Sequence, residues 1–288
     1  MKDNPPYGFH TTLAVIYTLL FLQASFCQTS AQENIKAYLN HLPPHIEISC
    51  TVQRGDGTVL FSHQAEKQVP SASIIKVPIL FYLMEAVGRG EVDLDEIREL
   101  QEEDKAEGSG QLQLFPAGSR FTLRYLAEEM IRISDNTATN ILINILGMEN
   151  IQQWLKGQGF HATQLNRLMM DFEAIEAGRQ NYTSAKEINR LFLMLINEDF
   201  LSPEYRDEAI HLLKSCADGT AFRRYLPPET EMAHKTGTLD YIRADAGIIF
   251  MEKPLVMAVF VEGFKTLEEA EVIIGQFAKM ALEDFKEN

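Results

Sequence analysis

The stretch SASIIKVPIL, residues 71–80, places a serine three positions before a lysine at the head of an apolar run. Residues three apart on a helix share a face, so Lys76 can reach the hydroxyl of Ser73. Pro78 stands about one turn into the run, where it removes a backbone hydrogen bond of a regular helix. We therefore predict a tight 3₁₀-like turn at Ser73 that leads into a helix. The stretch alone leaves open whether Ser73 merely begins that helix or is a nucleophile that Lys76 activates.

The chain as a whole has 288 residues, of which 45% are hydrophobic, enough for one two-lobed domain or two small ones. Its formal net charge is −15. An acidic chain repels phosphate backbones and anionic lipid head groups. We therefore expect neither nucleic acid nor a membrane surface as a partner.

The N-terminal segment differs from the rest of the chain. A lysine precedes an uncharged stretch whose centre, LAVIYTLLFL at 13–22, is followed by the polar run QTSAQ. Such a short apolar centre is typical of a secretion signal. Thr29 and Ala31 fit a small-x-small cleavage site, so we expect residues 1–31 to form a signal peptide and the mature protein to be secreted or periplasmic. A cut after Cys27, a lipid on that cysteine and an uncleaved anchor are the alternatives.

Cysteines and histidines give no sign of a metal site. Cys50 lies in a strand pattern, which favours a small core residue, and neither it nor Cys216 has a neighbour that suggests catalysis; whether they pair is left open. His41 and His45 are four apart, but two prolines between them exclude a shared helical face. We expect no metal and no other cofactor.

Hydrophobic patterning predicts a mixed α/β (α+β) fold with strands at both ends and helices between. Alternation in HIEISCTVQ, the turn RGDGT and the run VLFSHQ predict a hairpin, and three further strands lie in EMAHKTGT, AGIIFMEK and PLVMAVFVEGF. We expect a discontinuous α/β lobe from 32–70 and 217–288, built on an antiparallel sheet, and an all-helical lobe from 71–216. Together they would form one catalytic domain, 32–288, with a small-molecule site in the cleft between lobes.

Several helix ends are marked in the sequence. Thr122 is the expected cap of the helix TLRYLAEEMIRI, and Gly147 is a natural stop after TATNILINIL. Ser184 and Glu187 have capping-box spacing at the start of SAKEINRLFLMLI, and Pro203 fits a first helical position. An amphipathic helix is expected over 266–285.

Two further polar motifs follow Ser73-x-x-Lys76. SDN, residues 134–136, falls between two predicted helices, where alone it is an ordinary helix cap. KTG, residues 235–237, ends a predicted strand, where alone it is a solvated turn. In this order the three motifs form the signature of class A β-lactamases and penicillin-binding proteins. The sequence resembles the class A serine β-lactamase family over nearly all of its mature length, and the resemblance implies the β-lactamase/transpeptidase-like fold.

The resemblance implies a serine hydrolase that opens the β-lactam ring through an acyl-Ser73 intermediate. A serine hydroxyl is a poor nucleophile until a base takes its proton. Lys76 would be that base, and it must be neutral; the cation of Lys235 nearby in a partly desolvated cleft would lower its pKa. Ser134 would relay the proton to the leaving nitrogen. His234 and Asp135 are expected to be structural.

Substrate-binding roles are implied in the same way, for a small molecule that is a β-lactam or an acyl-D-alanyl peptide, bound by a monomer. Asn136 would donate to the acyl side chain, and the KTG segment with the following Thr238 would hold the carboxylate and supply an oxyanion N–H. Arg243 is the first candidate for an additional guanidinium at the carboxylate, ahead of Arg223 and Arg224. The substrate-binding residues are thus Asn136, Lys235, Thr236, Gly237, Thr238 and Arg243.

The loop that carries the deacylating glutamate of class A enzymes departs from the family pattern. That glutamate stands two residues after an arginine; Arg167 fits the arginine, but Met169 stands two residues on. Asp171 and Glu173 are the possible deacylation bases nearby, unless Asp171 only pairs with Arg167 and holds the loop. Acylation is therefore better supported than turnover. A D-alanyl-D-alanine peptidase, an esterase and an acyl-trapping penicillin-binding protein are the alternatives.

Overall fold

The computed structural model describes residues 32–197 and 201–286. The predicted signal peptide, 1–31, lies outside the described residues. A helical run over 32–40 precedes the first strand. In the described part of the chain, no helix is both long and apolar enough to cross a bilayer.

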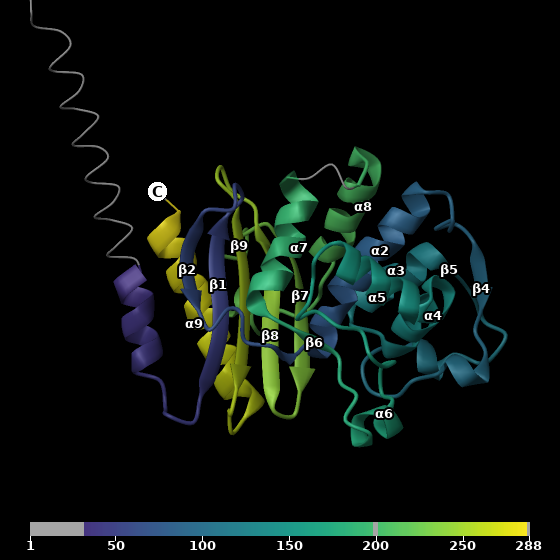
Figure 1. Cartoon of the computed structure of the whole chain (residues 1–288), viewed down its shortest axis with the longest axis horizontal. Coiled ribbons are helices and arrows are strands. Elements are labelled where there is room, and N and C mark those ends of the chain that lie inside the picture. Colours follow the sequence, from purple (N-terminus) through teal and green to yellow (C-terminus); the bar gives the residue numbers. More distant parts are fainter. Residues whose placement is uncertain (1–31, 198–200, 287–288) are drawn as a thin grey trace, which may run out of the picture.

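One five-stranded antiparallel sheet, with strand order β2-β1-β9-β8-β7, joins the two ends of the chain (Figure 1). The predicted hairpin and the three later strands are confirmed, with bounds β1 Glu47–Arg54, β2 Val59–His63, β7 Met232–Leu239, β8 Ile242–Ile249 and β9 Leu255–Glu262. Because β9 pairs with β1, the last strand of the chain lies beside the first. The mixed fold with an antiparallel sheet is confirmed.

The helical elements occupy mainly the middle of the chain: α2 to α6 gather beyond the β7 edge of the sheet, whereas α7 and α9 lie over the sheet itself (Figure 1). Their bounds are α2 Lys76–Gly88, α3 Leu123–Arg132, α4 Asn136–Leu146, α5 Met148–Gly157, α6 Phe172–Glu176, α7 Ala185–Asn197, α8 Pro203–Lys214 and α9 Leu267–Phe285. Short 3₁₀ turns lie at η1 Ala72–Ile75, η2 Glu102–Asp104, η3 Leu112–Leu114 and η4 Phe222–Arg224. Two small ribbons pair β3 Val69–Pro70 with β6 Tyr182–Thr183, and β4 Ile97–Glu99 with β5 Arg120–Thr122.

The central strands of the sheet are buried on both faces, and alternate residues of β9 enter different cores. In β9, Val256 and Ala258 belong to the larger core, which contains α7 and the central helices. Met257 and Val259 belong to a second core with α9. Side chains alternate across a strand, so a strand covered on both faces reads as a continuous apolar run. This burial explains why PLVMAVFVEGF shows little polar alternation.

Helix ends follow the sequence signals closely, with one difference. The hydroxyl of Thr122 caps α3, Gly147 ends α4 and Pro203 begins α8. Ser184 Oγ accepts from the N–H of Glu187, which is half of the predicted capping box. The Glu187 carboxylate instead accepts from three successive backbone N–H groups at 161–163, because these donors would otherwise lack a partner.

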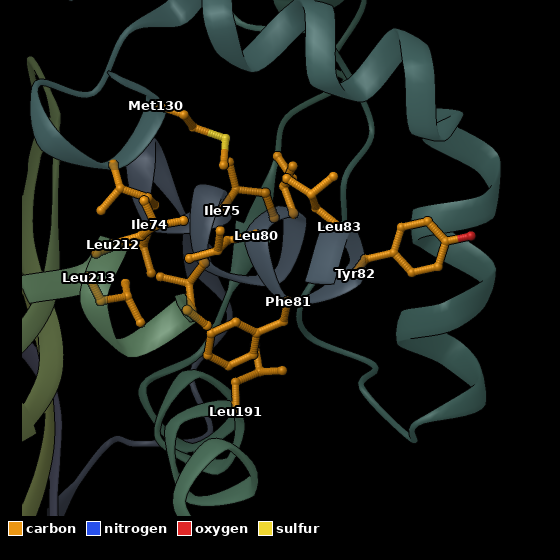
Figure 2. Close-up of a cluster of buried hydrophobic side chains, with 14 of the residues drawn as sticks. Ile74, Ile75, Leu80, Phe81, Tyr82, Leu83, Met130, Leu191, Leu212 and Leu213 are labelled. Atoms are coloured by element: carbon orange, nitrogen blue, oxygen red, sulfur yellow. The ribbon is translucent and has the colours of Figure 1, made fainter. Parts of the chain in front are cut away.

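Helix α2 lies in the larger core, and its burial fixes the turn before it. Figure 2 shows Ile74 and Ile75 of η1 among side chains from several helices, with Leu212 of α8 on one side. Phe81 points toward α7, where it meets Phe192 edge to face at 6.2 Å between ring centroids. Each such buried side chain contributes about 1.5–3 kcal/mol. Ser73, which lies between Ala72 and Ile74, is therefore held in a fixed position by the packing of its neighbours.

Candidate active site

Ser73 lies in the 3₁₀ turn η1, as predicted, and α2 begins at Lys76. Ala72 has φ +45°, a left-handed conformation that costs a non-glycine residue free energy. The turn is braced from outside, because the N–H of Ser71 donates to the carbonyl of Asn181 at 2.9 Å. This hydrogen bond helps to hold the turn around Ser73 in a conformation that the isolated chain would not favour, because of the left-handed φ of Ala72.

Lys76 is completely buried, and its amine contacts only uncharged acceptors. Its Nζ donates to the Ser134 carbonyl at 2.6 Å, to Ser134 Oγ at 3.0 Å and to Asn136 Oδ1 at 3.0 Å. As an ammonium, Lys76 gives all three donors to these groups and none to Ser73. The neutral amine has two N–H donors, so it gives up one of these bonds and has a lone pair free to accept a proton. Two of the three predicted motifs therefore meet at one nitrogen.

The pKa of Lys76 is lowered well below its ordinary value. Burial is the largest cause, the positive charge of Lys235 adds to it, and the Asp135 carboxylate opposes both. The pKa of Lys235 is also lowered, again mainly by burial. Burial together with the positive charge of Lys235 favours the neutral form of Lys76. This is the electrostatic condition under which a lysine can accept a proton.

The SDN segment is held by its central carboxylate. Asp135 caps α4 through the N–H of Ala138 at 2.8 Å, and it also accepts from the N–H groups of Gln111 and Leu112. Gly110 has φ +105°, and a Cβ there would fall 2.1 Å from Asp135 Oδ2. Asp135 is thus a buried acceptor that ties the 107–112 loop to the motif. Ser134 itself has φ +60°, a second left-handed residue at this site.

Strand β7 brings the KTG segment against the Ser73 turn. A Cβ on Gly237 would lie 3.1 Å from both Ala72 Cβ and Ile74 Cγ1, so glycine allows this close approach. Lys235 is 1% exposed, and its Nζ donates to the Thr236 carbonyl at 2.9 Å.

A cleft of about 310 Å³ joins the three motifs, since Ser73, Ser134, Lys235, Thr236 and Thr238 all line it. Sequence reasoning missed its other lining residues, which are Ser109, Arg132, Ile133, Cys216, Ala217 and Asp218. No motif marks these residues; they come from loops and helix ends that only folding brings to the cleft.

Arg243 lies behind Thr238 and lines neither this cleft nor its neighbour. It is 2% exposed; its guanidinium donates to Thr238 Oγ1 at 2.8 Å and pairs with Asp218 at 2.7 Å. Arg223 donates to the Thr230 carbonyl and Arg224 pairs with Glu268. Of the three arginines, Arg243 alone hydrogen-bonds to a cleft residue.

A smaller neighbouring cleft of about 130 Å³ is lined by Ser73 on one side and by residues of the 167–181 loop on the other. Met169 lines it together with Ser73 and Asn136. Asn140 holds Met169 through both backbone groups, accepting from its N–H at 2.8 Å and donating to its carbonyl at 3.1 Å. Met169 thus occupies a fixed position beside Ser73.

The carboxylates considered for deacylation lie elsewhere. Asp171 caps α6 through the N–H of Ala174 at 2.9 Å, and Glu173 is exposed. Neither is among the residues that line the two clefts. Asp171 makes no direct ion pair with Arg167 in the described residues, although its charge acts to raise the pKa of Arg167. The guanidinium instead donates to Gln180 Oε1 at 2.7 and 3.0 Å and to the Leu168 carbonyl.

Comparison with known proteins agrees with this arrangement. A family model described as "Beta-lactamase enzyme family" matches residues 29–285. A β-lactamase of Streptomyces fradiae is 28% identical over 232 residues, covering 77% of this chain and 76% of the relative.

Solved structures extend the likeness to the fold. PBP-A is 27% identical with a TM-score of 0.81, covering 91% of this chain and 96% of its own. A β-lactamase from Sphaerobacter thermophilus is also 27% identical, with a TM-score of 0.78, covering 89% of this chain and 95% of its own. The resemblance inferred from the three motifs is therefore confirmed: the chain belongs to the beta-lactamase enzyme family.

Proposed function

We propose that the protein opens the amide bond of β-lactams by forming an acyl-enzyme on Ser73, in the manner of class A β-lactamases. The observation that carries this proposal is the buried, pKa-lowered amine of Lys76, hydrogen-bonded to Ser134, with Ser73 and Lys235 on the same cleft. A base of lowered pKa next to a serine is what nucleophilic catalysis requires.

Acylation begins when neutral Lys76 accepts the proton of Ser73 Oγ, which attacks the lactam carbonyl. The backbone N–H groups of Ser73 and Thr238 stabilise the oxyanion, and one such donor is typically worth about 3 kcal/mol of barrier. The C–N bond then breaks. Ser134 Oγ, 3.0 Å from Lys76 Nζ, gives its proton to the leaving nitrogen and regains one from the lysine.

Substrate binding uses both ends of the cleft. Lys235 and Thr236 would hold the carboxylate, with Gly237 allowing the close approach of Thr238. Arg243 would act on the carboxylate through Thr238, whose Oγ1 accepts its hydrogen bond. One amide hydrogen of Asn136 is used by the Glu107 carbonyl at 2.9 Å, which leaves the second for the acyl side chain of the substrate.

An acyl-trapping penicillin-binding protein is a second candidate function, favoured by Met169. A thioether beside Ser73 cannot activate the water that hydrolyses an acyl-serine. The similarity to PBP-A adds weight, since a mutant of that protein is known as an acyl-enzyme complex with penicillin G.

Intact mass measured over time after mixing with benzylpenicillin tests the proposal. A transient adduct with product release supports the β-lactamase, and a lasting stoichiometric adduct supports the acyl trap. Absence of any adduct, with an acyl-ester substrate cleaved, would instead indicate an esterase on this scaffold.

The loop variants should separate acylation from deacylation. Met169→Glu places a carboxylate in the cleft beside Ser73, so we expect the acyl-enzyme lifetime to shorten by about 10²-fold or more. Asp171→Asn and Glu173→Gln should leave that lifetime unchanged, because both side chains lie outside the two clefts. The lifetime is measured by mass after removal of excess penicillin. A long-lived acyl-enzyme in Asp171→Asn or Glu173→Gln would identify that carboxylate as the base.

The pH dependence of acylation should report on Lys76. Its neutral form is active, so the rate falls on the acid side as the lysine protonates. Lys235→Ala removes a nearby positive charge and therefore raises the pKa of Lys76, which should move the acid limb to higher pH. The acid side of the pH–rate profile is measured by stopped-flow acylation at saturating substrate. Lys235→Arg keeps the positive charge and is the control. An unmoved limb in Lys235→Ala would mean that another group controls the rate.

We propose export with loss of residues 1–31, a secreted or periplasmic location, and a monomeric enzyme whose partner is its small-molecule substrate. The lobes 32–70 with 217–288 and 71–216 would form one catalytic domain around the cleft.

A further inference from the structure

Three titratable side chains outside the acylation machinery lie near one another at the wall of the cleft, and one of them, Cys216, lines it. Cys216 follows α8, His234 lies in β7 next to Lys235, and Asp245 lies in β8. His234 and Asp245 are fully buried, and Cys216 is 6% exposed. The two cysteines in the described residues, Cys50 and Cys216, are both free thiols.

Asp245 orients the imidazole of His234. One carboxylate oxygen lies 2.9 Å from His234 Nδ1, and the other accepts from the N–H of Phe222 at 3.0 Å. The other ring nitrogen, Nε2, is buried and has no hydrogen-bond partner in the described part of the chain. Cys216 is the second side chain that interacts electrostatically with this imidazole, after Asp245. Gly247 faces His234 across the strand pair, and a Cβ there would fall 2.5 Å from His234 Cβ.

The charges of this group favour a thiolate and an imidazolium. Burial raises the pKa of the Cys216 thiol, but the charges of His234 and Lys235 outweigh it and leave the pKa below its ordinary value, while Asp245 opposes them. Burial lowers the pKa of His234, yet Asp245 and Cys216 together raise it to about 10. A thiolate paired with an imidazolium is the reactive form of cysteine.

Access to Cys216 comes from the substrate cleft. Cys216 and Lys235 both line the space that contains Ser73, whose volume of about 310 Å³ admits a small molecule. Cys50 contrasts with it: that thiol is fully buried in β1, and burial raises its pKa.

We propose that Cys216 is a covalent modification site for small disulfides, and that its modification blocks the cleft at Ser73. The Cys216 thiolate attacks one sulfur of the disulfide, a new S–S bond forms, and the old S–S bond breaks. The displaced thiolate leaves with the electron pair. His234 can take the proton of the thiol, and the disulfide itself is the oxidant, so the step needs no further oxidant or base.

The stoichiometry of thiol release tests the site without any β-lactam. The full chain carrying Cys27→Ser, which removes the third cysteine, is mixed with dithiodipyridine. We expect one thiopyridone per folded chain, none from Cys216→Ser in the same time, and one from Cys50→Ser as control. Peptide mass mapping of the parent must place the adduct on Cys216. Release only after denaturation, or an adduct elsewhere, overturns the proposal.

The pH dependence of the thiol reaction distinguishes activation of the Cys216 thiol by His234 from a merely structural role of the imidazole. His234→Asn should slow the reaction near neutral pH by about tenfold for each unit by which the thiol pKa rises. The difference should vanish at high pH, where every thiol is ionised. A variant that is slowed equally at all pH values, or not slowed, would show that the imidazole does not activate Cys216.

Blocking of the cleft has its own readout. Protein modified at Cys216 should lose acylation of Ser73 by a fluorescent penicillin and regain it after reduction by dithiothreitol. Acylation at the unmodified rate would overturn this part. Because thiol release is measured without penicillin, failure of the proposed β-lactam chemistry and failure of the modification site are distinguishable.

Discussion

Ser73→Ala should abolish covalent labelling by a fluorescent penicillin. The hydroxyl of Ser73 is the nucleophile of the proposed mechanism, and it lines the cleft beside Ser134 and Lys235. Without it no acyl-enzyme can form, whereas the cleft keeps its shape because η1 is held by Ile74 and Ile75. Labelling is read by in-gel fluorescence after denaturation, which removes penicillin that is not covalently bound.

A matched control lies two residues earlier in the same segment. Ser71 is buried, and within the described ranges its hydroxyl makes a single hydrogen bond, to the Ala72 carbonyl at 3.3 Å. Ser71→Ala should therefore keep its label. Undiminished labelling of Ser73→Ala would assign the acylated residue elsewhere in the chain.

Lys76→Ala should slow acylation by about 10²–10⁴-fold, the usual cost of losing a positioned base. The same change leaves two part-buried acceptors on Ser134 and one buried acceptor on Asn136 without their donor, which costs about 1–3 kcal/mol of stability. Both effects follow from one nitrogen, so rate and stability must be measured separately.

Single-turnover acylation gives the rate, and thermal unfolding of the same sample gives the stability. Lys76→Met keeps most of the side-chain volume without the base and should show the same slow rate. Lys105→Ala, a change in a partly exposed lysine paired with Glu102, is the matched control and should acylate normally. A near-normal rate in folded Lys76→Ala would mean that another group takes the serine proton.

Much of the fold could be predicted because its signals are local. Pro78 removes a helical hydrogen bond, so the turn at Ser73 is 3₁₀ and α2 begins only at Lys76. Thr122 and Gly147 mark helix ends through their own backbone and side-chain preferences. Of the two hydrogen bonds of the predicted capping box, the structure shows the one from the Glu187 N–H to Ser184 Oγ. The Glu187 carboxylate binds N–H groups that are distant in the sequence instead.

Local sequence by itself determined the turn at Ser73, the strand and helix pattern, and the three motifs that identify the family. Only the tertiary structure decided which groups meet: Lys76 with Ser134 and Asn136, Met169 with the cleft, and Cys216 with His234. Hydrogen bonds and charge effects depend on distances of a few ångströms between segments far apart in the chain. Those distances are set by packing of both faces of the sheet, which no single stretch of sequence specifies.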